Sequence, residues 1–177
     1  MAQLTSRLAG LDDLSALQRV MSASIAELQR GFLTPAQIEA SRMIMGLDRQ
    51  LVADGTYFVV ESESAIAGCG GWSRRATLYG GDHTPGRDAA LLDPATDAAR
   101  VRAMYTHPQF ARRGVGRLIL ELCEVAAKAE GFSRLELMGT MSGRPLYESA
   151  GYVVIEDIVD DRGGAPVPLV RMVKSIA

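Results

Sequence analysis

The sequence predicts a mixed α/β protein in which strands and helices alternate along one domain covering residues 1–177. Some stretches alternate polar and apolar residues, as half-buried strands do, whereas others place apolar residues three and four positions apart, as amphipathic helices do. Glycine, proline and aspartate separate these stretches, which is typical of turns. The 177 residues and the 47% share of hydrophobic residues are enough for one sizeable core. We therefore expect a central sheet with helices packed against it.

The first two elements are predicted to be a short strand and a long helix. Residues 4–8 form the strand candidate. Residues 12–28 keep apolar side chains at helical spacing, which predicts an amphipathic helix that stops before Gly31. Asp12 or Asp13 is expected to cap its first turn.

A second helix is predicted to begin after Thr34. Thr34 suits the N-cap, Pro35 the first helical position, and Gln37 completes a capping box. We expect this helix to run to about Gly46 and to be followed by a less regular stretch toward Asp54.

The next two elements read as a β-hairpin. Residues 56–61 and 65–72 are strand-like and flank a turn at Ser62 to Ser64. Glycines in the second strand predict a bulge or a close approach of another backbone, at positions 68, 70 and 71.

Residues 74–98 are rich in glycine, proline and aspartate and have no clear period. Loops of this length are uncommon in compact domains and are usually functional or disordered. Two interpretations stay open, a mobile surface insertion and a substrate lid.

The second half of the chain alternates between the two types of element. In order, the pattern predicts a strand at 99–106, a helix at 114–129, a strand at 134–138, a short helix at 142–150, and strands at 152–158 and 168–173.

The run between the strand at 99–106 and the helix at 114–129 predicts a site for a pyrophosphate. The first turn of a helix leaves backbone N–H groups unpaired and carries partial positive charge. Gly114 and Gly116 would let a ligand approach that backbone. Positive charge gathers at the same place, from Arg112, Arg113 and Arg117. Such a helix start is a ready anion site.

Three other interpretations apply to this run. Glycines before a helix often serve only as caps. A dinucleotide-binding turn would need a third glycine where Ile119 stands, although Glu136 falls where its ribose-binding acid would be. A Walker A loop is excluded, because the sequence has no Gly-Lys-Ser or Gly-Lys-Thr.

Composition excludes several classes of partner. The net charge is −2 and the basic residues are dispersed, so a nucleic-acid partner is not expected. No apolar run reaches the ~20 residues of a membrane span, and no signal peptide is visible, so we expect a cytoplasmic protein without a membrane partner. Cys69 and Cys123 are expected to be core residues. His83 and His107 do not make a metal site.

The run MYTHPQFARRGVGRLIL, followed by RPLYESAGY, resembles the acetyl-CoA signature of the GNAT N-acetyltransferase superfamily. The order of elements resembles that family over nearly the whole chain, and the motifs resemble it over about residues 100–153. The resemblance implies a mixed, mostly antiparallel sheet of about six to seven strands, flanked by helices on both faces. It also implies an acetyl-CoA-dependent enzyme that acetylates a primary amine of a small molecule or peptide by direct attack on the thioester. A homodimer is compatible with the sequence.

Cofactor contacts follow from the same resemblance. The family pattern is Gln or Arg, two residues, Gly, one residue, then Gly or Ala; Gly114 and Gly116 fit it, and Ala111 departs from it. Thr140 stands where many relatives have an Asn that touches the cofactor. The implied cofactor-binding residues are Met104, Tyr105 and Thr106 for the pantetheine arm, Arg112, Arg113, Gly114, Val115, Gly116 and Arg117 for the pyrophosphate, and Thr140.

The resemblance also implies the catalytic groups. Tyr147 would protonate the leaving thiolate, with the alternative that it only packs its helix onto the sheet. The backbone N–H of Tyr105 would stabilise the oxyanion. The acid that relatives often carry beside Arg100 and Arg102 is absent here, and the open candidates for the general base are Glu27, Asp97, His83, His107 and a water chain.

We expect the acceptor where the first two helices and residues 74–98 meet the open end of the sheet. Because the base is not visible, a non-catalytic acyl-CoA-binding sensor of the same fold stays open as an alternative, with a nicotinamide-dependent oxidoreductase more distant.

Overall fold

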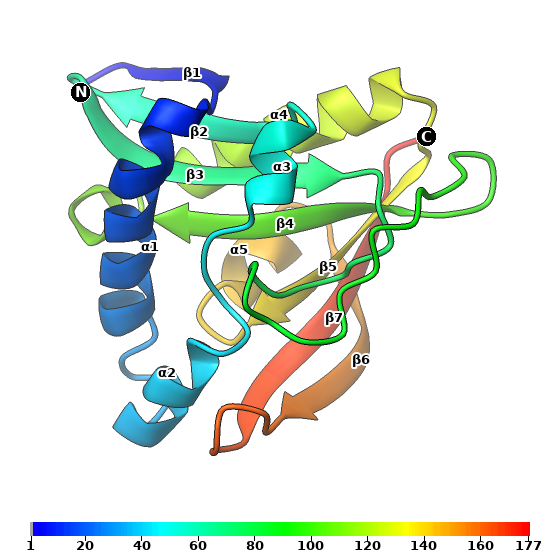
Figure 1. Ribbon diagram of the computed structural model, residues 1–177. Coiled ribbons are helices and arrows are strands. Elements are labelled where there is room, and N and C mark those ends of the chain that lie inside the picture. The colour runs from blue at the N-terminus through cyan, green and yellow to red at the C-terminus, as the bar shows by residue number, and fades with distance from the viewer. Residues whose placement is uncertain (1) are drawn as a thin grey trace.

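The computed structural model describes residues 2–177 as a seven-stranded sheet in the order β1-β2-β3-β4-β5-β7-β6 (Figure 1). The strands are β1 (Leu4–Leu8), β2 (Tyr57–Ser62), β3 (Ala65–Ser73), β4 (Ala99–Thr106), β5 (Arg134–Thr140), β6 (Val153–Asp160) and β7 (Val167–Ser175). Neighbouring strands are antiparallel except β4 and β5. The predicted fold class is confirmed, and the dinucleotide-binding alternative is excluded because that fold needs a mostly parallel sheet.

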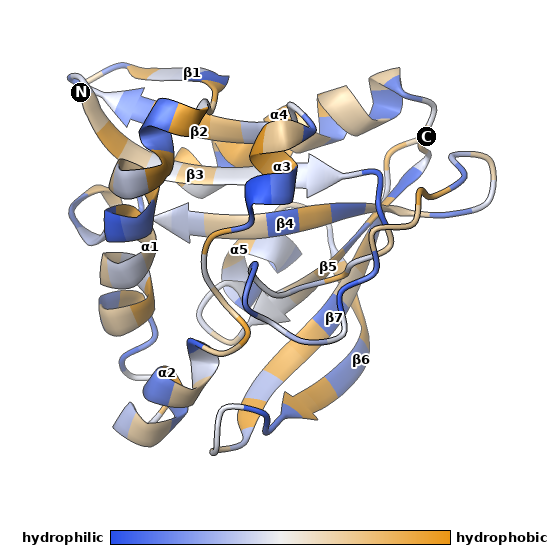
Figure 2. Ribbon diagram, in the orientation of Figure 1, coloured by the Kyte–Doolittle hydropathy of each residue, from blue (hydrophilic) through white to orange (hydrophobic). Residues whose placement is uncertain are grey.

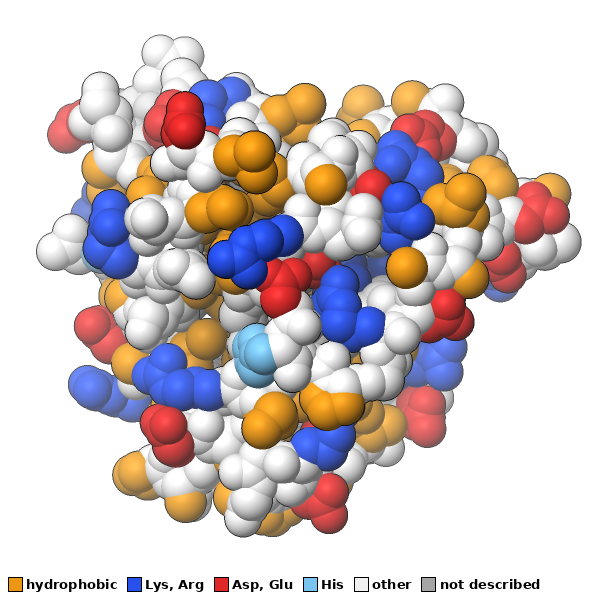
Figure 3. Space-filling view, in the orientation of Figure 1, with side chains coloured by type: hydrophobic (Ala, Val, Ile, Leu, Met, Phe, Trp, Pro, Cys, Tyr) orange, Lys and Arg blue, Asp and Glu red, His pale blue; other side chains and the backbone are white. Residues whose placement is uncertain are grey.

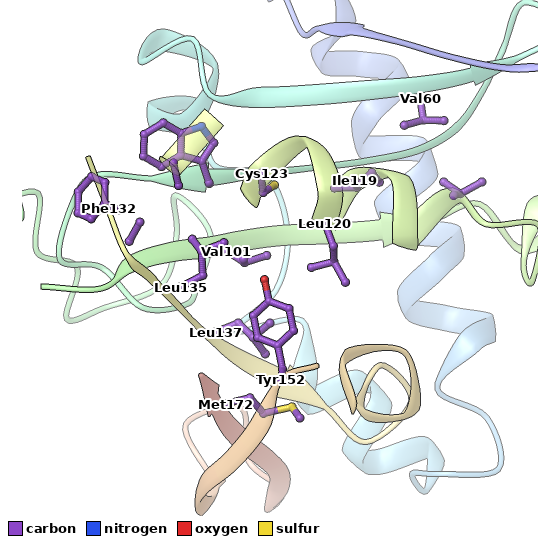
Figure 4. Close-up of a cluster of buried hydrophobic side chains, with 14 of the residues drawn as sticks. Val60, Val101, Ile119, Leu120, Cys123, Phe132, Leu135, Leu137, Tyr152 and Met172 are labelled. Carbon is purple, nitrogen blue, oxygen red and sulfur yellow. The ribbon is translucent and has the colours of Figure 1, made fainter. Parts of the chain in front are cut away.

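Helices cover both faces of the sheet (Figure 1). They are α1 (Leu14–Leu28), α2 (Pro35–Ser41), α3 (Arg49–Ala53), α4 (Val115–Ala129) and α5 (Arg144–Ser149). The helix α4 packs on one face and buries Ile119, Leu120 and Cys123 against β4 and β5 (Figure 4). On the other face, α1 and α3 form a second cluster that includes Cys69. Both cysteines are fully buried, which confirms their core role.

The predicted start of the second helix is confirmed. Thr34 Oγ1 accepts from the Gln37 N–H at 3.2 Å, and the Thr34 N–H donates to Gln37 Oε1 at 2.9 Å. Its predicted end at Gly46 is wrong, because α2 ends at Ser41. There the Ser41 hydroxyl donates to the Ile38 carbonyl at 2.6 Å, and the chain leaves the helix.

Two further expectations near the N-terminus are corrected. The stretch from Gly46 to Asp54 contains α3, which was not predicted because five residues are too few to show a helical period. Asp13 occupies the N-cap position of α1, as predicted, but its carboxylate accepts from the Gly10 N–H at 2.7 Å and so closes the preceding 3₁₀ turn rather than bonding the first turn of α1.

The predicted β2–β3 hairpin is confirmed. Its two loop residues, Glu63 and Ser64, have φ of 50° and 68°, the left-handed pair that matches a twisted hairpin. The glycines of β3 allow the close approach that the sequence predicted, since a Cβ at Gly68 would lie 2.5 Å from Val115 Cγ1. The remaining elements end within two residues of their predicted bounds. No helix in the described part of the chain is long and apolar enough to cross a membrane.

Candidate functional site

The strands β4 and β5 pair only at their beginning and then separate (Figure 1). Their pairing is limited to Ala99 with Leu135 and Arg100 with Glu136. Beyond it, Ala103 has a φ of 51°, and the Tyr57 hydroxyl donates to its carbonyl at 2.6 Å, which holds this irregularity in place. The edge of β4 from residue 102 to residue 106 therefore has no partner strand on the β5 side. Such an edge can hydrogen-bond an extended ligand.

The N-terminus of α4 presents unpaired backbone donors beside this opening. The first bond within the helix runs from the Leu118 N–H to the Gly114 carbonyl at 3.0 Å, so the N–H groups of residues 115–117 precede it. Arg112 and Gly114 have φ of 61° and 84°, with an ordinary residue between them. Left-handed residues alternating with right-handed ones turn successive N–H groups toward one concave surface that suits an anion.

The side chains around this helix start agree with such a ligand. Arg112 and Arg113 are exposed, and the Arg113 guanidinium lies over the Phe110 ring at 5.5 Å. Arg117 donates to the hydroxyl of Ser149 on α5 at 3.0 Å. No atom lies within 4 Å of a Cβ built at Gly114, so the space over that backbone is open. Gly114 therefore leaves room for a ligand at the start of α4, whereas a Cβ at Gly116 would lie 2.5 Å from Leu146 Cδ2, so this glycine packs against α5. Pyrophosphate binding by residues 112–117 stays a prediction.

Between the separated strands lies a cavity of about 80 Å³, which we call the channel. Its lining includes Val101 and Leu137 from the face covered by α4, and Arg102 and Tyr79 from the opposite face, so it passes between β4 and β5. Within residues 2–177, its lining holds no aspartate, glutamate or histidine. Of the predicted site residues, Met104, Tyr105, Thr140 and Tyr147 line it.

Tyr147 is held rigidly at the channel. Its ring packs against Gly139 and Gly143, where an added Cβ would lie 3.1 Å and 2.8 Å from ring carbons, and it meets the Tyr152 ring edge-on at 6.3 Å. Its hydroxyl makes no hydrogen bond to any residue from 2 to 177. Burial, with a smaller effect of Cys123, raises the pKa of Tyr147 to about 12, so the phenol stays protonated at neutral pH.

Thr140 and Tyr105 shape the channel walls. Thr140 Oγ1 accepts from the Gly143 N–H at 3.1 Å and so builds the turn that leads into α5. The Tyr105 side chain is buried, and its hydroxyl accepts from the Gly46 N–H at 2.8 Å. Burial raises the pKa of Tyr105 above its ordinary value.

A second recess of about 360 Å³ lies outside the channel, and we call it the outer cleft. Its lining residues are Gln18, Met21, Ser22 and Ile25 of α1, Arg42, Met45, Gly46, Leu47 and Arg49 around the α2–α3 connection, and Asp82 and His83. The connection is largely hydrophobic (Figure 2), and charged side chains gather over the middle of the same face (Figure 3). This is the region where the sequence predicted the acceptor.

The four candidate bases lie in different surroundings. Glu27 is exposed and lines neither recess. The Asp97 carboxylate closes a turn inside the 74–98 segment, where it accepts a backbone N–H at 2.7 Å. His107 Nδ1 accepts from the Gln109 N–H at 3.2 Å and caps a 3₁₀ turn. Only His83 lines a recess.

The hydrogen bond of His83 determines which of its nitrogens is free. Its Nε2 lies 2.7 Å from the Arg42 carbonyl oxygen. A carbonyl can only accept, so Nε2 carries the proton and the Nδ1 of the neutral ring keeps its lone pair. His83 Nδ1 can therefore take a proton from a ligand.

The 74–98 segment crosses in front of β4, β5 and β7 (Figure 1) and is held by buried ion pairs that the sequence did not indicate. Arg102 donates to Asp48 at 2.9 Å and to the Gly80 carbonyl at 2.6 Å, and Arg87 donates to the other Asp48 oxygen at 2.9 Å. Burial lowers the pKa of Arg102. These bonds tie the segment to α3 and β4, and its residues 78–80 and 82–83 line the channel and the outer cleft.

Comparison with known proteins identifies the family of this fold. The family model described as acetyltransferase (GNAT) domain matches residues 53–154. The chain belongs to the GNAT acetyltransferase family. Comparison with curated proteins gives no match.

Solved GNAT structures share the fold over nearly their full length. The GCN5-related N-acetyltransferase from Rhodopseudomonas palustris is 19% identical, with a TM-score of 0.73 and coverage of 99% of this chain and 97% of that one. The PaiA N-acetyltransferase from Thermoplasma acidophilum, in complex with coenzyme A, is 15% identical with a TM-score of 0.64 and coverage of 98% and 99%. The putative acetyltransferase YncA from Salmonella typhimurium, with acetyl-CoA, is 15% identical with a TM-score of 0.66 and coverage of 99% and 95%.

Proposed function

We propose that this GNAT protein transfers the acetyl group of acetyl-CoA to a primary amine. One observation carries the proposal: Tyr147, whose hydroxyl makes no hydrogen bond to residues 2–177, lines the channel beside the unpaired edge of β4, and the chain runs from that edge through residues 107–114 into the unpaired N–H groups of α4. An anion site, an extended-chain site and a proton donor thus adjoin one another. Two similar structures hold coenzyme A or acetyl-CoA, which supports the choice of donor.

In this proposal three parts of the chain bind three parts of acetyl-CoA. The backbone of Arg112 to Arg117 binds the pyrophosphate, with Arg112 and Arg113 supplying further positive charge. The edge of β4 at Met104 to Thr106 hydrogen-bonds the pantetheine arm. Thr140 borders the acetyl end of the channel.

Bound acetyl-CoA supplies an activated thioester. Residues of the chain donate and accept protons and stabilise the negative charge that develops during transfer. Tyr147 donates its phenolic proton to the departing sulfur, and its raised pKa keeps that proton in place until then. The Tyr105 backbone N–H, which the family resemblance implied as the oxyanion donor, faces β3, because Tyr105 is paired with Cys69 in the register in which the His107 N–H donates to the Ala67 carbonyl at 2.8 Å. The Met104 N–H faces the opening and stabilises negative charge on the carbonyl oxygen instead. His83 Nδ1 accepts the proton that the amine must lose.

Calorimetric titration with coenzyme A tests the donor site. We expect binding with a Kd below ~100 μM, an affinity at which a cofactor-like ligand is usefully held. An absence of measurable binding at that concentration would contradict the proposal.

A second candidate function is a non-catalytic acyl-CoA-binding sensor. One observation favours it, since the channel lining contains no carboxylate or imidazole that could take a proton beside the thioester. A panel of primary amines, with detection of the released thiol, separates the two functions. The transferase consumes acetyl-CoA with at least one amine, whereas the sensor binds coenzyme A without turnover.

A further inference from the structure

The channel and the outer cleft meet at one dipeptide. Met45 and Gly46 line both recesses, so they form the boundary between them. With the acetyl group at the channel, as proposed above, an acceptor reaches it from the outer cleft by passing this dipeptide. The body of the acceptor then lies in the outer cleft, and its amine points toward Gly46. This step rests on the proposed function.

The charged side chains of the outer cleft carry a surplus of positive charge. They are Arg42, Arg49, Asp82 and the neutral or cationic His83. Asp82 is already occupied, because its two oxygens accept from the Arg49 N–H at 2.9 Å and from Arg49 Nη1 at 2.7 Å. No unoccupied carboxylate of the described chain remains in the lining to hold a cation.

Both arginines keep nitrogens available for a ligand. Arg42 uses only Nε, in an ion pair at 3.2 Å with Glu39, whose side chain is 79% exposed. Such exposed pairs contribute little and are easily exchanged. Arg49 uses Nη1, and its Nη2 makes no hydrogen bond to residues 2–177. Planar guanidinium groups with free N–H bonds are the preferred partners of a carboxylate.

Apolar side chains also line the outer cleft, beside the polar Gln18 and Ser22 of α1. Met21 and Ile25 of α1 face it together with Met45 and Leu47. The cleft volume of about 360 Å³ lies at the lower end of the range for small-molecule sites. The cleft therefore offers an apolar surface, a net positive charge and two guanidinium groups with available N–H bonds to a ligand of modest size.

We propose that the acceptor is an apolar free amino acid. Its side chain would lie against Met21, Ile25 and Met45, its carboxylate between Arg42 and Arg49, and its amine toward His83 Nδ1. In the step itself, the ammonium group loses one proton to His83, and the nitrogen of the resulting neutral amine forms a bond to the acetyl carbonyl carbon. The carbon–sulfur bond breaks as the sulfur takes the proton of Tyr147, and the second proton that the nitrogen loses restores the Tyr147 phenol. Polyamines and polycationic antibiotics fit poorly, since they need free carboxylates. A peptide N-terminus lacks the neighbouring carboxylate.

A matched panel of amines tests this assignment. Phenylalanine, phenylalaninamide and phenethylamine share an apolar body but only the first carries a carboxylate, and spermidine represents cationic acceptors. We expect kcat/KM for phenylalanine to exceed that for each of the others about tenfold or more, the usual effect of a charge-assisted contact. Equal or faster turnover of phenylalaninamide or spermidine overturns the assignment.

Arginine variants, assayed with acetyl-CoA present, locate the contact with the carboxylate of the acceptor. Arg42→Gln and Arg49→Gln should each raise KM for phenylalanine about tenfold while leaving kcat/KM for phenethylamine unchanged, because only the carboxylate contact is lost. Arg30→Gln, an exposed arginine outside both recesses, is the matched control and should change neither. An equal loss of kcat/KM for phenylalanine and for phenethylamine overturns the assignment.

Binding of the product distinguishes failure of this inference from failure of the proposed function. N-acetylphenylalanine should bind more tightly than N-acetylphenylalaninamide, measured calorimetrically with coenzyme A present, and Arg49→Gln should abolish the difference. Coenzyme A binding without turnover of any amine contradicts the transferase function. Turnover without any preference for the carboxylate contradicts only the amino-acid assignment.

Discussion

His83 is the residue whose setting most directly links structure to chemistry. A Cβ built at Gly46 would lie 3.2 Å from its Cε1, and one at Gly81 would lie 3.1 Å from the same atom. The two glycines thus allow the ring to lie flat against the chain, while the Arg42 carbonyl fixes Nε2 as the donor. The orientation of Nδ1 follows from these contacts rather than from the side chain alone.

Replacement of His83 should impair catalysis without impairing donor binding. We expect His83→Gln to lower kcat about 10²-fold, at the lower end of what a positioned acid or base contributes. The Kd for coenzyme A should not change, because His83 lies in the outer cleft and not at α4. Steady-state kinetics and calorimetry measure the two effects.

His107→Gln is the matched control, since His107 lines neither recess. We expect its kcat to equal that of the wild-type protein. A full rate in His83→Gln, or an equal loss in both variants, would contradict the role of His83 as base.

At the scale of the elements, the 74–98 segment, α3 and β4 are joined at Asp48. Its carboxylate accepts from Arg87 and Arg102 and also from the Gln50 N–H at 3.0 Å, which caps α3. Asp48 and Arg102 side chains are only 1% and 2% exposed, so removing one partner leaves a buried charge uncompensated.

We expect Asp48→Asn to lower the free energy of unfolding by roughly 3–5 kcal/mol, the usual loss when one member of a buried ion pair is removed. Urea unfolding measures it. Glu148→Gln, which breaks the exposed pair with Arg144, is the control and should cost about 0–1 kcal/mol. If Asp48→Asn lowers the free energy of unfolding no more than the control does, the ion pairs of Asp48 do not stabilise the fold.

What could be predicted from the sequence depended on how local the signal was. The capping box at Thr34 and the hairpin turn act over a few residues, so the sequence predicted them correctly. The junction of Asp48 with Arg102 and the contact of Tyr57 with Ala103 join residues far apart in the chain. No spacing rule connects such pairs, so the wall built by residues 74–98 could not be predicted.

At the scale of the whole molecule, the separation of β4 from β5 creates two sides to one site. The face covered by α4 presents unpaired amides, and the opposite face presents the outer cleft, with the channel between them. The expected acceptor region, where the first two helices and residues 74–98 meet the open end of the sheet, agrees with this division in outline. The side chains that line the outer cleft could not be predicted, because α1, the α2–α3 connection and residues 82–83 meet only in the fold.

The most direct test of acetyl transfer at the channel is kcat of Tyr147→Phe with saturating acetyl-CoA and an accepted amine, compared with Tyr152→Phe. The two tyrosines lie in one cluster, with their rings 6.3 Å apart, but the Tyr152 hydroxyl donates to Glu124 at 3.2 Å and does not line the channel. We predict a loss of about 10²-fold in Tyr147→Phe, the size of a lost proton donor, and a nearly unchanged kcat in Tyr152→Phe. A Tyr147→Phe variant that keeps full kcat would contradict the account.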